Sequence, residues 1–259
     1  QNTAAAPGVM LERMFTALHR GGSGDPMVLL HGFTDTWRTW ELVLPTLEQH
    51  ADVLAPTLLG HAGGPPLPAD LHSGSIADAV ERQMDEAGFE TAHIVGNSLG
   101  GYVALQLAER GRARSVVALA PGGGWADGDE SYKETLAHFL ELRPAVEAAA
   151  PHAASLMETP QGRRLATREI LVHYEHVPAE LLAHQLVGAA RCDALEPFTE
   201  LALAHGWPID AATVTCPIRM VWGTADQILA YPRAALRYRD ALFPHADWVV
   251  LDDVGHLPQ

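Results

Sequence analysis

The pattern Gly-x-Ser-x-Gly occupies residues 96–100, directly after the apolar pair Ile94-Val95 and before a stretch of helical character. A strand, a glycine-flanked serine and a helix in this order are typical of a nucleophile elbow, a sharp turn that exposes the serine hydroxyl. Glycine fits on both sides because a side chain there would collide with the neighbouring strand or helix. Backbone N–H groups at the start of the helix would face the negative charge that develops during attack. We therefore expect Ser98 to be a nucleophile.

A serine nucleophile needs a base that takes its proton and an acid that orients the base. Asp226 follows a predicted strand at 218–222, and His256 follows a predicted strand at 248–251. The carboxyl ends of parallel strands meet at one edge of a sheet, and the chain order Ser, Asp, His is the order expected for this elbow. The sequence predicts a triad of Ser98, Asp226 and His256.

Each partner of the serine also has a plainer interpretation. An aspartate in a glycine-rich turn commonly caps the turn, and His256 is one of fourteen histidines. Asp252 and Asp253 are rival acids, although their closeness in sequence to the histidine suggests that they serve its loop. The common position at strand ends favours Asp226.

The elements that would position these groups alternate between strands and helices. Residues Val9 to Arg20 are expected to form an edge hairpin strand, and a glycine-rich turn follows at 21–26. Apolar runs predict further strands, and helical spacing predicts helices at 37–49, 75–87, 102–110 and 232–242. The strands are expected at 27–30, 52–55, 115–120, 218–222 and 248–251, besides the one that leads to Ser98. Such alternation implies right-handed crossovers and an α/β fold with a mostly parallel sheet.

The alternation stops between Gly122 and Trp207, where helical patterns occur without a convincing strand. Examples are the stretches 132–142, 163–173 and 179–191. We expect a core of residues 1–121 and 208–259, and a helical insertion of residues 122–207 over the strand ends where ligands bind in open α/β sheets. Three residues near this junction, Trp125, Ile228 and Leu229, are candidates for the wall of a substrate-binding cleft.

The composition limits the partners. The chain carries 17 basic and 32 acidic residues, a net charge of −15. Nucleic acid and anionic membrane surfaces attract basic patches, so neither is expected as a partner. No run approaches the roughly 20 apolar residues that span a bilayer. Residues 1–8 do not form an intact signal peptide. We expect a cytoplasmic protein that acts on a small-molecule ester, with secretion after cleavage of a signal left open.

Cysteines and paired histidines raise the possibility of a metal. Cys192 and Cys216 lack metal-type spacing and are expected to be free thiols. His173 and His176, with Glu175 between them, lack a clear third ligand and are expected to lie on a solvated helix face. We expect neither a metal nor another cofactor.

Four short motifs together resemble the signature set of the α/β-hydrolase superfamily, and the likeness is greatest to its small cap-bearing serine esterases. They are His31-Gly32-Phe33, Gly96-Asn97-Ser98-Leu99-Gly100-Gly101, Trp222-Gly223-x-x-Asp226 and Gly255-His256. The resemblance covers nearly the whole chain. It implies an α/β-hydrolase fold, a mostly parallel twisted sheet flanked by helices, with residues 122–207 as an inserted helical cap.

The resemblance also implies roles for individual residues. The backbone N–H groups of Phe33 and Leu99 would form the oxyanion hole, and His31 would brace the loop rather than act as a base. Relatives that cleave epoxides or carbon–halogen bonds carry aspartate at the position of Ser98, so those activities are disfavoured.

Two departures from the family pattern are expected to matter. Relatives often have Asp-x-x-Gly-x-Gly after the third strand, whereas residues 56–64 read Pro-Thr-Leu-Leu-Gly-His-Ala-Gly-Gly. Gln259 follows His256 by three residues, whereas similar proteins continue into a final helix. We expect the native chain to continue, because His256 would otherwise lie on a frayed terminus.

The expected function is hydrolysis of carboxylic esters through an acyl-enzyme. One alternative is a carbon–carbon bond hydrolase of the meta-cleavage type, which the segments Gly96-Asn97-Ser98 and Ala120-Pro121-Gly122-Gly123 resemble somewhat. Another is a protein that senses a small apolar ligand with a slow triad. The sequence leaves the acyl and alcohol specificity, lactone or amide cleavage, and the oligomeric state open.

Overall fold

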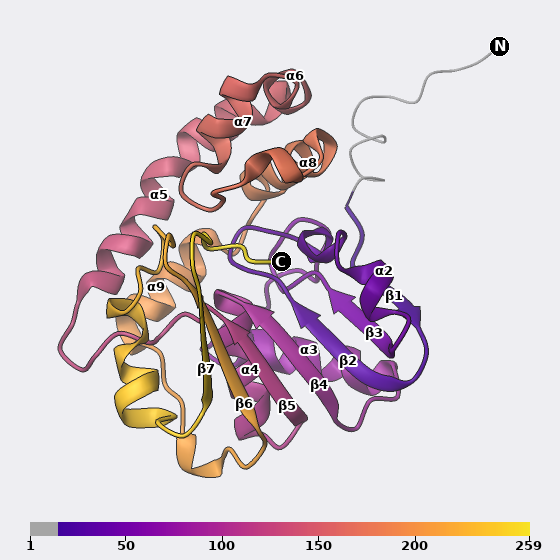
Figure 1. Ribbon diagram of the computed structural model, residues 1–259, viewed down its shortest axis with the longest axis vertical. Coiled ribbons are helices and arrows are strands. Elements are labelled where there is room, and N and C mark those ends of the chain that lie inside the picture. Colours follow the sequence, from indigo (N-terminus) through magenta and orange to yellow (C-terminus); the bar gives the residue numbers. More distant parts are fainter. Residues whose placement is uncertain (1–14) are drawn as a thin grey trace.

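The computed structural model describes residues 15–259. Within that range the chain forms a seven-stranded sheet with helices on both faces and a helical insertion above one end (Figure 1). The strands are β1 (Leu18–Gly22), β2 (Asp25–Leu30), β3 (Ala51–Pro56), β4 (Ala92–Asn97), β5 (Ala113–Leu119), β6 (Ile218–Gly223) and β7 (Asp247–Leu251). Their order is β1-β3-β2-β4-β5-β6-β7, and every pair is parallel except β1 with β3.

The predicted α/β fold with a mostly parallel sheet is therefore confirmed. The edge strand differs from the prediction, because β1 pairs antiparallel with β3 and not with β2, which follows it in the chain. Glycines with positive φ at 22 and 24 turn the chain between β1 and β2, so that β3 lies between them. The part of the predicted hairpin before residue 15 lies outside the described residues.

Side chains alternate between the two faces of the sheet, as the two-residue period of a strand requires. Val28 and Leu30 of β2 pack into the core beneath α3 (Ser75–Glu86) and α4 (Leu99–Glu109), whereas Leu29 packs on the opposite face. On that opposite face, Trp40 and Leu44 come from the short helices η1 (Trp37–Trp40) and α2 (Leu44–Leu47).

The predicted helix at 37–49 is wrong as a single element. The chain forms the 3-10 helix η1, and α2 starts only at Leu44. Pro45 explains the interruption, because it lacks an N–H and its ring clashes with the carbonyl four residues earlier in a continuous helix.

The insertion between β5 and β6 is helical throughout its regular elements. These are α5 (Ser131–Ala149), η2 (Ala150–His152), α6 (Ala153–Met157), α7 (Pro160–Thr167), η3 (Tyr174–His176), α8 (Ala179–Ala190), α9 (Leu195–His205) and η4 (Ala211–Thr213). Figure 1 shows α5–α8 stacked above the sheet, at the end where β4 leads into α4. All of α5–α9 lie inside the predicted insertion 122–207, whose independence as a unit stays a prediction.

Two further helices differ from their predicted extents. α7 begins at Pro160, where the Thr159 hydroxyl accepts from Gly162 N, and it ends at Thr167 rather than at 173. The expected helix 232–242 is divided into η5 (Arg233–Ala235) and the π-helical η6 (Tyr238–Leu242). Arg237 N donates to the carbonyl of Gly124 outside this segment, which takes it out of a regular helical ladder.

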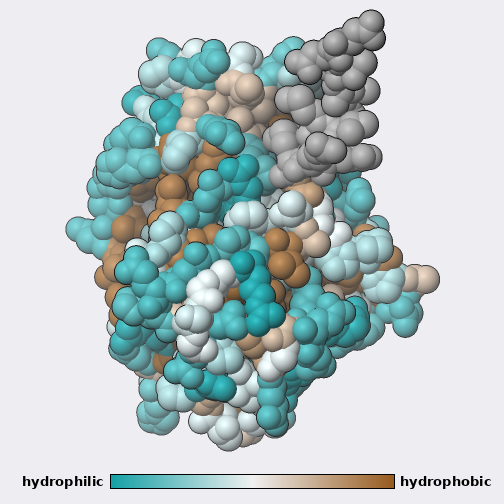
Figure 2. All heavy atoms as spheres, turned by 90° about the vertical axis from the view of Figure 1, so that its right-hand side faces the viewer, coloured by the Kyte–Doolittle hydropathy of each residue, from teal (hydrophilic) through white to brown (hydrophobic). Residues whose placement is uncertain are grey.

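The hydropathy of the surface and of the helices bears on whether a membrane could be a partner. Figure 2 shows one face, on which hydrophilic side chains predominate and hydrophobic ones appear in smaller groups between them. Among residues 15–259, no helix combines the length and the apolar character needed to cross a bilayer.

Candidate active site

Ser98 stands at the junction of β4 and α4 with φ 54° and ψ −116°. Positive φ is uncommon for a residue with a side chain and strains the backbone. Ser98 N donates to the carbonyl of Leu119 at 2.9 Å, which ties the turn to the end of β5. This is the sharp turn that the Gly-x-Ser-x-Gly pattern predicts.

The two glycines of the elbow are required by close backbone contacts. A Cβ atom on Gly96 would lie 2.1 Å from the carbonyl oxygen of Gly100, and one on Gly100 would lie 2.2 Å from that of Leu30. Both neighbouring atoms belong to the backbone of central elements, so neither can move away cheaply. The start of α4 can therefore approach β2 and β4 only without side chains at these positions.

Asp226 and His256 are paired and buried. Asp226 Oδ2 accepts a hydrogen bond from His256 Nδ1 at 2.8 Å, and the two residues are 5% and 4% exposed. The other carboxylate oxygen accepts from the backbone N–H groups of Ile228 and Leu229 at 2.9 and 2.8 Å. Because a carboxylate only accepts, the Nδ1 atom carries the proton and Nε2 keeps its lone pair. The imidazole is thus in the tautomer that a general base requires.

The rival acids have other partners. Asp252 Oδ1 accepts from the Thr224 hydroxyl at 3.2 Å, and Asp253 lies 3.2 Å from His173 Nε2. Both aspartates are exposed. The geometry therefore favours Asp226 as the orienting acid.

The main chain of His256 is held next to the elbow. Asn97, the residue before the serine, is fully buried, and its amide nitrogen donates to the His256 carbonyl at 2.9 Å. On the other side, Leu257 N donates to the carbonyl of Ile170, which follows α7. These contacts hold the His256 main chain between the elbow and the segment after α7.

Ser98 and the imidazole of His256 form no hydrogen bond with each other within residues 15–259. Catalytic hydrogen bonds are often long in unliganded enzymes and tighten when substrate binds. The anchoring of both residues through Asn97 keeps them at the same edge of the sheet.

Two backbone N–H groups are free to form an oxyanion hole. Among the described residues, neither Phe33 N nor Leu99 N donates to another protein group, and both residues line the cavity that contains Ser98. His31 holds the first of these loops: its Nδ1 atom is bonded to the Gly32 carbonyl, and its Nε2 atom accepts from Leu58 N at 2.8 Å. Burial lowers the pKa of His31 well below its usual value, so the ring stays neutral. His31 thus braces the loop, as expected.

The unusual loop after β3 is well packed despite its departure from the family pattern. Leu58 and His61 are 1% and 3% exposed, and Ala194 N donates to the carbonyl of Gly60. Burial lowers the pKa of His61 to about 4, which keeps this ring neutral beside His31.

The loop after β2 is also tied to the insertion. Asp35 accepts from Thr36 N at 2.8 Å and from the Gln185 amide of α8 at 3.0 Å. Burial raises the pKa of Asp35 to about 6. The Thr36 hydroxyl is bonded to His184 Nε2, and burial lowers the pKa of His184 to about 4. A polar cluster therefore connects α8 to the segment that presents Phe33.

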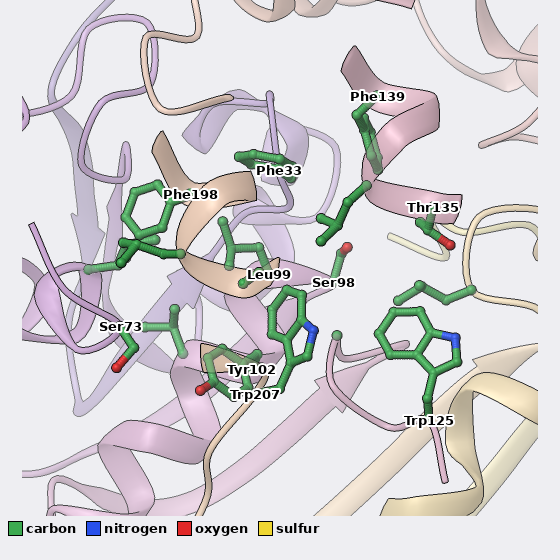
Figure 3. A pocket seen from close by; sticks show the side chains of 18 of the residues that line it. Phe33, Ser73, Ser98, Leu99, Tyr102, Trp125, Thr135, Phe139, Phe198 and Trp207 are labelled. Carbon is green, nitrogen blue, oxygen red and sulfur yellow. The ribbon is translucent and has the colours of Figure 1, made fainter. Parts of the chain in front are cut away.

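A cavity of about 70 Å³ opens beside Ser98, and Trp125, Ile228 and Leu229 are among the residues that line it. The insertion contributes Phe139 from α5 and Phe198 from α9 (Figure 3). Sequence reasoning also missed Tyr102, Val103 and Gln106 of α4 and Trp207. The spacing of 99, 102, 103 and 106 along one helix face could have indicated the α4 residues. In the part of the chain that the structure describes, no charged side chain lines the cavity.

The histidines of the insertion do not gather ligands. The rings of His173 and His176 stack at 5.6 Å, and His173 lies 3.6 Å from Glu175 besides its contact with Asp253. They lie at η3 and just before it, and not on a helix that continues from 163. No group of three or more metal-type side chains occurs within residues 15–259. Cys192 and Cys216 are free thiols, and burial raises the pKa of Cys192 to about 12.

Comparison with known proteins places this geometry in a family. Residues 25–259 match the family model described as alpha/beta hydrolase fold. The epoxide hydrolase EphH of Mycobacterium tuberculosis is 36% identical over 188 residues, which cover 73% of this chain and 88% of that protein. The 2-hydroxymuconate semialdehyde hydrolase of a Pseudomonas species is 36% identical over 122 residues, 42% of this chain and 40% of that protein.

A solved structure is similar to this chain in its fold. A thermophilic esterase from Thermogutta terrifontis aligns with a TM-score of 0.68 at 20% identity, over 93% of this chain and 86% of that one. At this identity the likeness shows the fold alone. Together with the match of the family model, the elbow and the sheet order show that the chain belongs to the α/β hydrolase fold family.

Proposed function

We propose that this protein is a serine hydrolase that cleaves neutral carboxylic esters through an acyl-enzyme. The observation that carries the proposal is the pairing of His256 with Asp226 at the strand edge where the elbow presents Ser98. His256 Nε2 takes the proton of Ser98 as the hydroxyl oxygen attacks the ester carbonyl. The N–H groups of Phe33 and Leu99 stabilise the oxyanion, an effect of about 10²–10³-fold in rate per donor in related sites.

Acylation ends when protonated His256 donates to the leaving alcohol, which departs and leaves the acyl group on Ser98. In the second half of the reaction, His256 takes a proton from water as the water oxygen attacks the acyl carbon. His256 then returns that proton to the Ser98 oxygen as its bond to the acyl carbon breaks and the acid leaves. In this scheme the helical insertion is a cap, and its Phe139 and Phe198 exclude water from the acyl group.

Epoxide hydrolysis fits this site poorly, although a relative bears that name. A serine hydroxyl that opened an epoxide would form an ether, which water does not cleave readily. A carboxylate nucleophile instead forms an ester, which can be hydrolysed. The hydroxyl of Ser98 therefore favours acyl transfer.

Cleavage of a carbon–carbon bond in a vinylogous diketone is the second candidate, and the semialdehyde hydrolase relative supports it. The substrate named for that relative is a carboxylate, and a buried carboxylate needs a cation or several donors. The uncharged lining of the cavity favours a neutral ester instead. A protein that only senses an apolar ligand would not need the Asp226–His256 pair.

The test compares turnover of p-nitrophenyl butyrate by the wild type and by Ser98→Ala. We expect kcat to fall by at least about 10⁴-fold, because the oxygen that attacks the ester carbonyl is lost. The matched control is Ser115→Ala, since Ser115 lies on β5 bonded to His93 and does not line the cavity. Retained esterase activity in Ser98→Ala would overturn the proposal.

Two parallel assays address the alternatives. Loss of the colour of a ring-fission product, with no turnover of any ester, would favour the carbon–carbon hydrolase. Ligand-induced thermal stabilisation without turnover of either substrate would favour the sensing protein.

A further inference from the structure

Residues 32–35 form the turn that carries Phe33, one of the two oxyanion donors. Asp35 N donates to the Gly32 carbonyl at 3.3 Å, and this hydrogen bond closes the turn. Inside the turn, Thr34 has φ 64°, a conformation that favours glycine and strains a residue branched at Cβ. Such strain persists only where surrounding contacts enforce it. The contacts that hold the two ends of this turn therefore decide where Phe33 N points.

The two ends of the turn are held by different parts of the protein. His31 Nε2 accepts from Leu58 N, so the Nδ1 atom carries the proton and donates to the Gly32 carbonyl at 2.7 Å. At the other end, Asp35 Oδ2 accepts from the amide nitrogen of Gln185 in α8 at 3.0 Å. Figure 1 shows α8 above the segment that follows β2. The core thus holds the first residue of the turn, and the helical insertion holds the last.

The Asp35 carboxylate links Gln185 to the main chain of the turn. Its Oδ1 atom accepts from Thr36 N at 2.8 Å, which fixes the rotation of the carboxylate relative to the backbone. Its Oδ2 atom then faces α8, and because a carboxylate only accepts, the NH₂ group of Gln185 must point at it. The next residue repeats the link, since the Thr36 hydroxyl is bonded to His184 Nε2 at 3.0 Å. Two successive residues of the loop therefore contact two successive residues of α8.

Gln185 and Asp35 act at a distance from the substrate. In the part of the chain that the structure describes, neither side chain lines the cavity that contains Ser98, whereas Phe33 does. Any effect of this pair on the reaction therefore passes through the turn. The oxyanion forms only as the ester carbonyl is attacked, so a turn that loses its shape weakens binding of the transition state and leaves binding of the ester unchanged.

We propose that Gln185 is a positioning residue for the oxyanion hole: through Asp35, it holds the strained turn in the shape that directs Phe33 N at the oxyanion. This inference rests on the proposed ester hydrolysis at Ser98. The helical insertion then contributes to the chemical step itself, besides covering the acyl group. Loss of the Gln185 hydrogen bond lowers kcat and leaves KM nearly unchanged, because the donor that it positions acts in the transition state.

The experiment measures turnover of p-nitrophenyl butyrate at pH 9 by the wild type and by variants of this pair. Gln185→Met keeps the length of the side chain but cannot donate. Gln185→Glu places a second carboxylate, ionised at this pH, opposite Asp35. Each change should lower kcat at least tenfold, which is part of the roughly 10²–10³-fold that one oxyanion donor supplies, while KM changes by less than about threefold.

A double variant restores the hydrogen bond in the reverse direction. In Asp35→Asn/Gln185→Glu, Thr36 N still fixes the oxygen of the shorter side chain, so its NH₂ group faces α8 and donates to the new carboxylate. The double variant should recover kcat to within about threefold of the wild type, a coupling expected only of residues in direct contact.

The matched control breaks another polar contact between α8 and the core. Glu180, near the start of α8, lies 3.8 Å from Arg38 and is exposed. Glu180→Gln should keep kcat within about twofold of the wild type, because exposed ion pairs contribute little. An unchanged kcat in both single variants at Gln185, a loss that appears in KM alone, or an equal loss in Glu180→Gln would overturn the proposal.

Amide hydrogen exchange distinguishes failure of this inference from failure of the proposed function, because it needs no substrate. In the peptide that covers residues 31–40, exchange should be faster in both single variants at Gln185 and should return to the wild-type rate in the double variant. If the wild type turns over no ester but this pattern holds, ester hydrolysis is wrong and the hold on the turn stands. If esters are turned over and exchange stays unchanged, the hold is wrong. Faster exchange with an unchanged kcat would show that the turn does not position the oxyanion donor.

Discussion

The Asp226 carboxylate makes three hydrogen bonds, and Asp226→Asn would keep two of them and reverse the third. Two backbone N–H groups, of Ile228 and Leu229, point at Oδ1, and His256 Nδ1 points at Oδ2. An asparagine has a single acceptor oxygen and an NH₂ group. The two backbone donors fix the oxygen on their side, because an NH₂ group there would face them donor to donor. The asparagine nitrogen must therefore face His256.

That reversal changes the tautomer of the imidazole. With a donor opposite it, Nδ1 of His256 has to accept, and the proton moves to Nε2. The Nε2 atom then has no lone pair with which to take the proton of Ser98. The corresponding change in a serine protease triad lowers kcat by about 10⁴-fold, and a loss of that size is about 5.4 kcal/mol in activation free energy. We expect a loss of the same order here, with the fold retained.

The assay is steady-state turnover of p-nitrophenyl butyrate at pH 7.5, together with a thermal melt to show that the variant is folded. Asp253→Asn is the matched control, because Asp253 is in the same loop as His256 but is exposed and contacts His173. It should keep near-normal activity. If Asp226→Asn lost less than tenfold in kcat, or Asp253→Asn lost as much, the assignment of the acid would be refuted.

Two predictions concern the frame of the site. In Gly100→Ala the new Cβ would lie 2.2 Å from the Leu30 carbonyl oxygen, so the free energy of unfolding measured in urea should fall by about 3 kcal/mol or more. In the control Gly188→Ala, the nearest neighbours of the new Cβ are side-chain atoms 3.3 Å away, so the free energy of unfolding should hardly change. Equal losses in the two variants would contradict this packing argument. The pKa of Asp35 is about 6 in the folded protein against 3.8 for a free carboxyl, so the folded state binds the Asp35 proton more tightly than the unfolded state does. The free energy of unfolding should therefore decline as pH rises from about 4 to about 6, where the folded protein loses this proton. Asp35→Asn should remove that decline in melting curves recorded across this range, and an unchanged pH dependence would show that the carboxyl is not desolvated.

The elements that could be predicted from the sequence are those that neighbouring residues in the chain determine. The elbow was predictable because glycines at 96 and 100 leave few conformations open, and apolar runs placed the strands within a few residues. Asp226 and His256 could be named because both follow strands whose carboxyl ends share one edge.

The predicted helices were wrong where a proline or a contact with a distant segment interrupted a helical pattern of apolar residues. The apolar spacing of residues 37–49 predicted one helix, but Pro45 divides it. The stretch 163–173 has helical spacing, yet α7 ends at Thr167, and the Ile170 carbonyl accepts from Leu257 N beside His256. Such contacts between distant segments have no signature in either segment alone.

The cavity was the least predictable feature. Its walls come from α4, α5, α9 and the segment after Asp226, so its shape depends on how the insertion sits over the sheet. Sequence spacing could indicate which α4 residues share a face. It could not show which side chains of α5 and α9 would face those residues across the cavity.

The most direct test of the central claim is covalent labelling with an active-site-directed p-nitrophenyl alkylphosphonate, followed by proteolysis and mass spectrometry. The reagent reports which hydroxyl is activated by a neighbouring base, independently of the natural substrate. We expect one equivalent of adduct on the peptide that contains Ser98, with release of p-nitrophenol, and labelling slowed strongly in Asp226→Asn. An adduct on another residue, or equally fast labelling of Ser98 without the Asp226 carboxylate, would contradict the account.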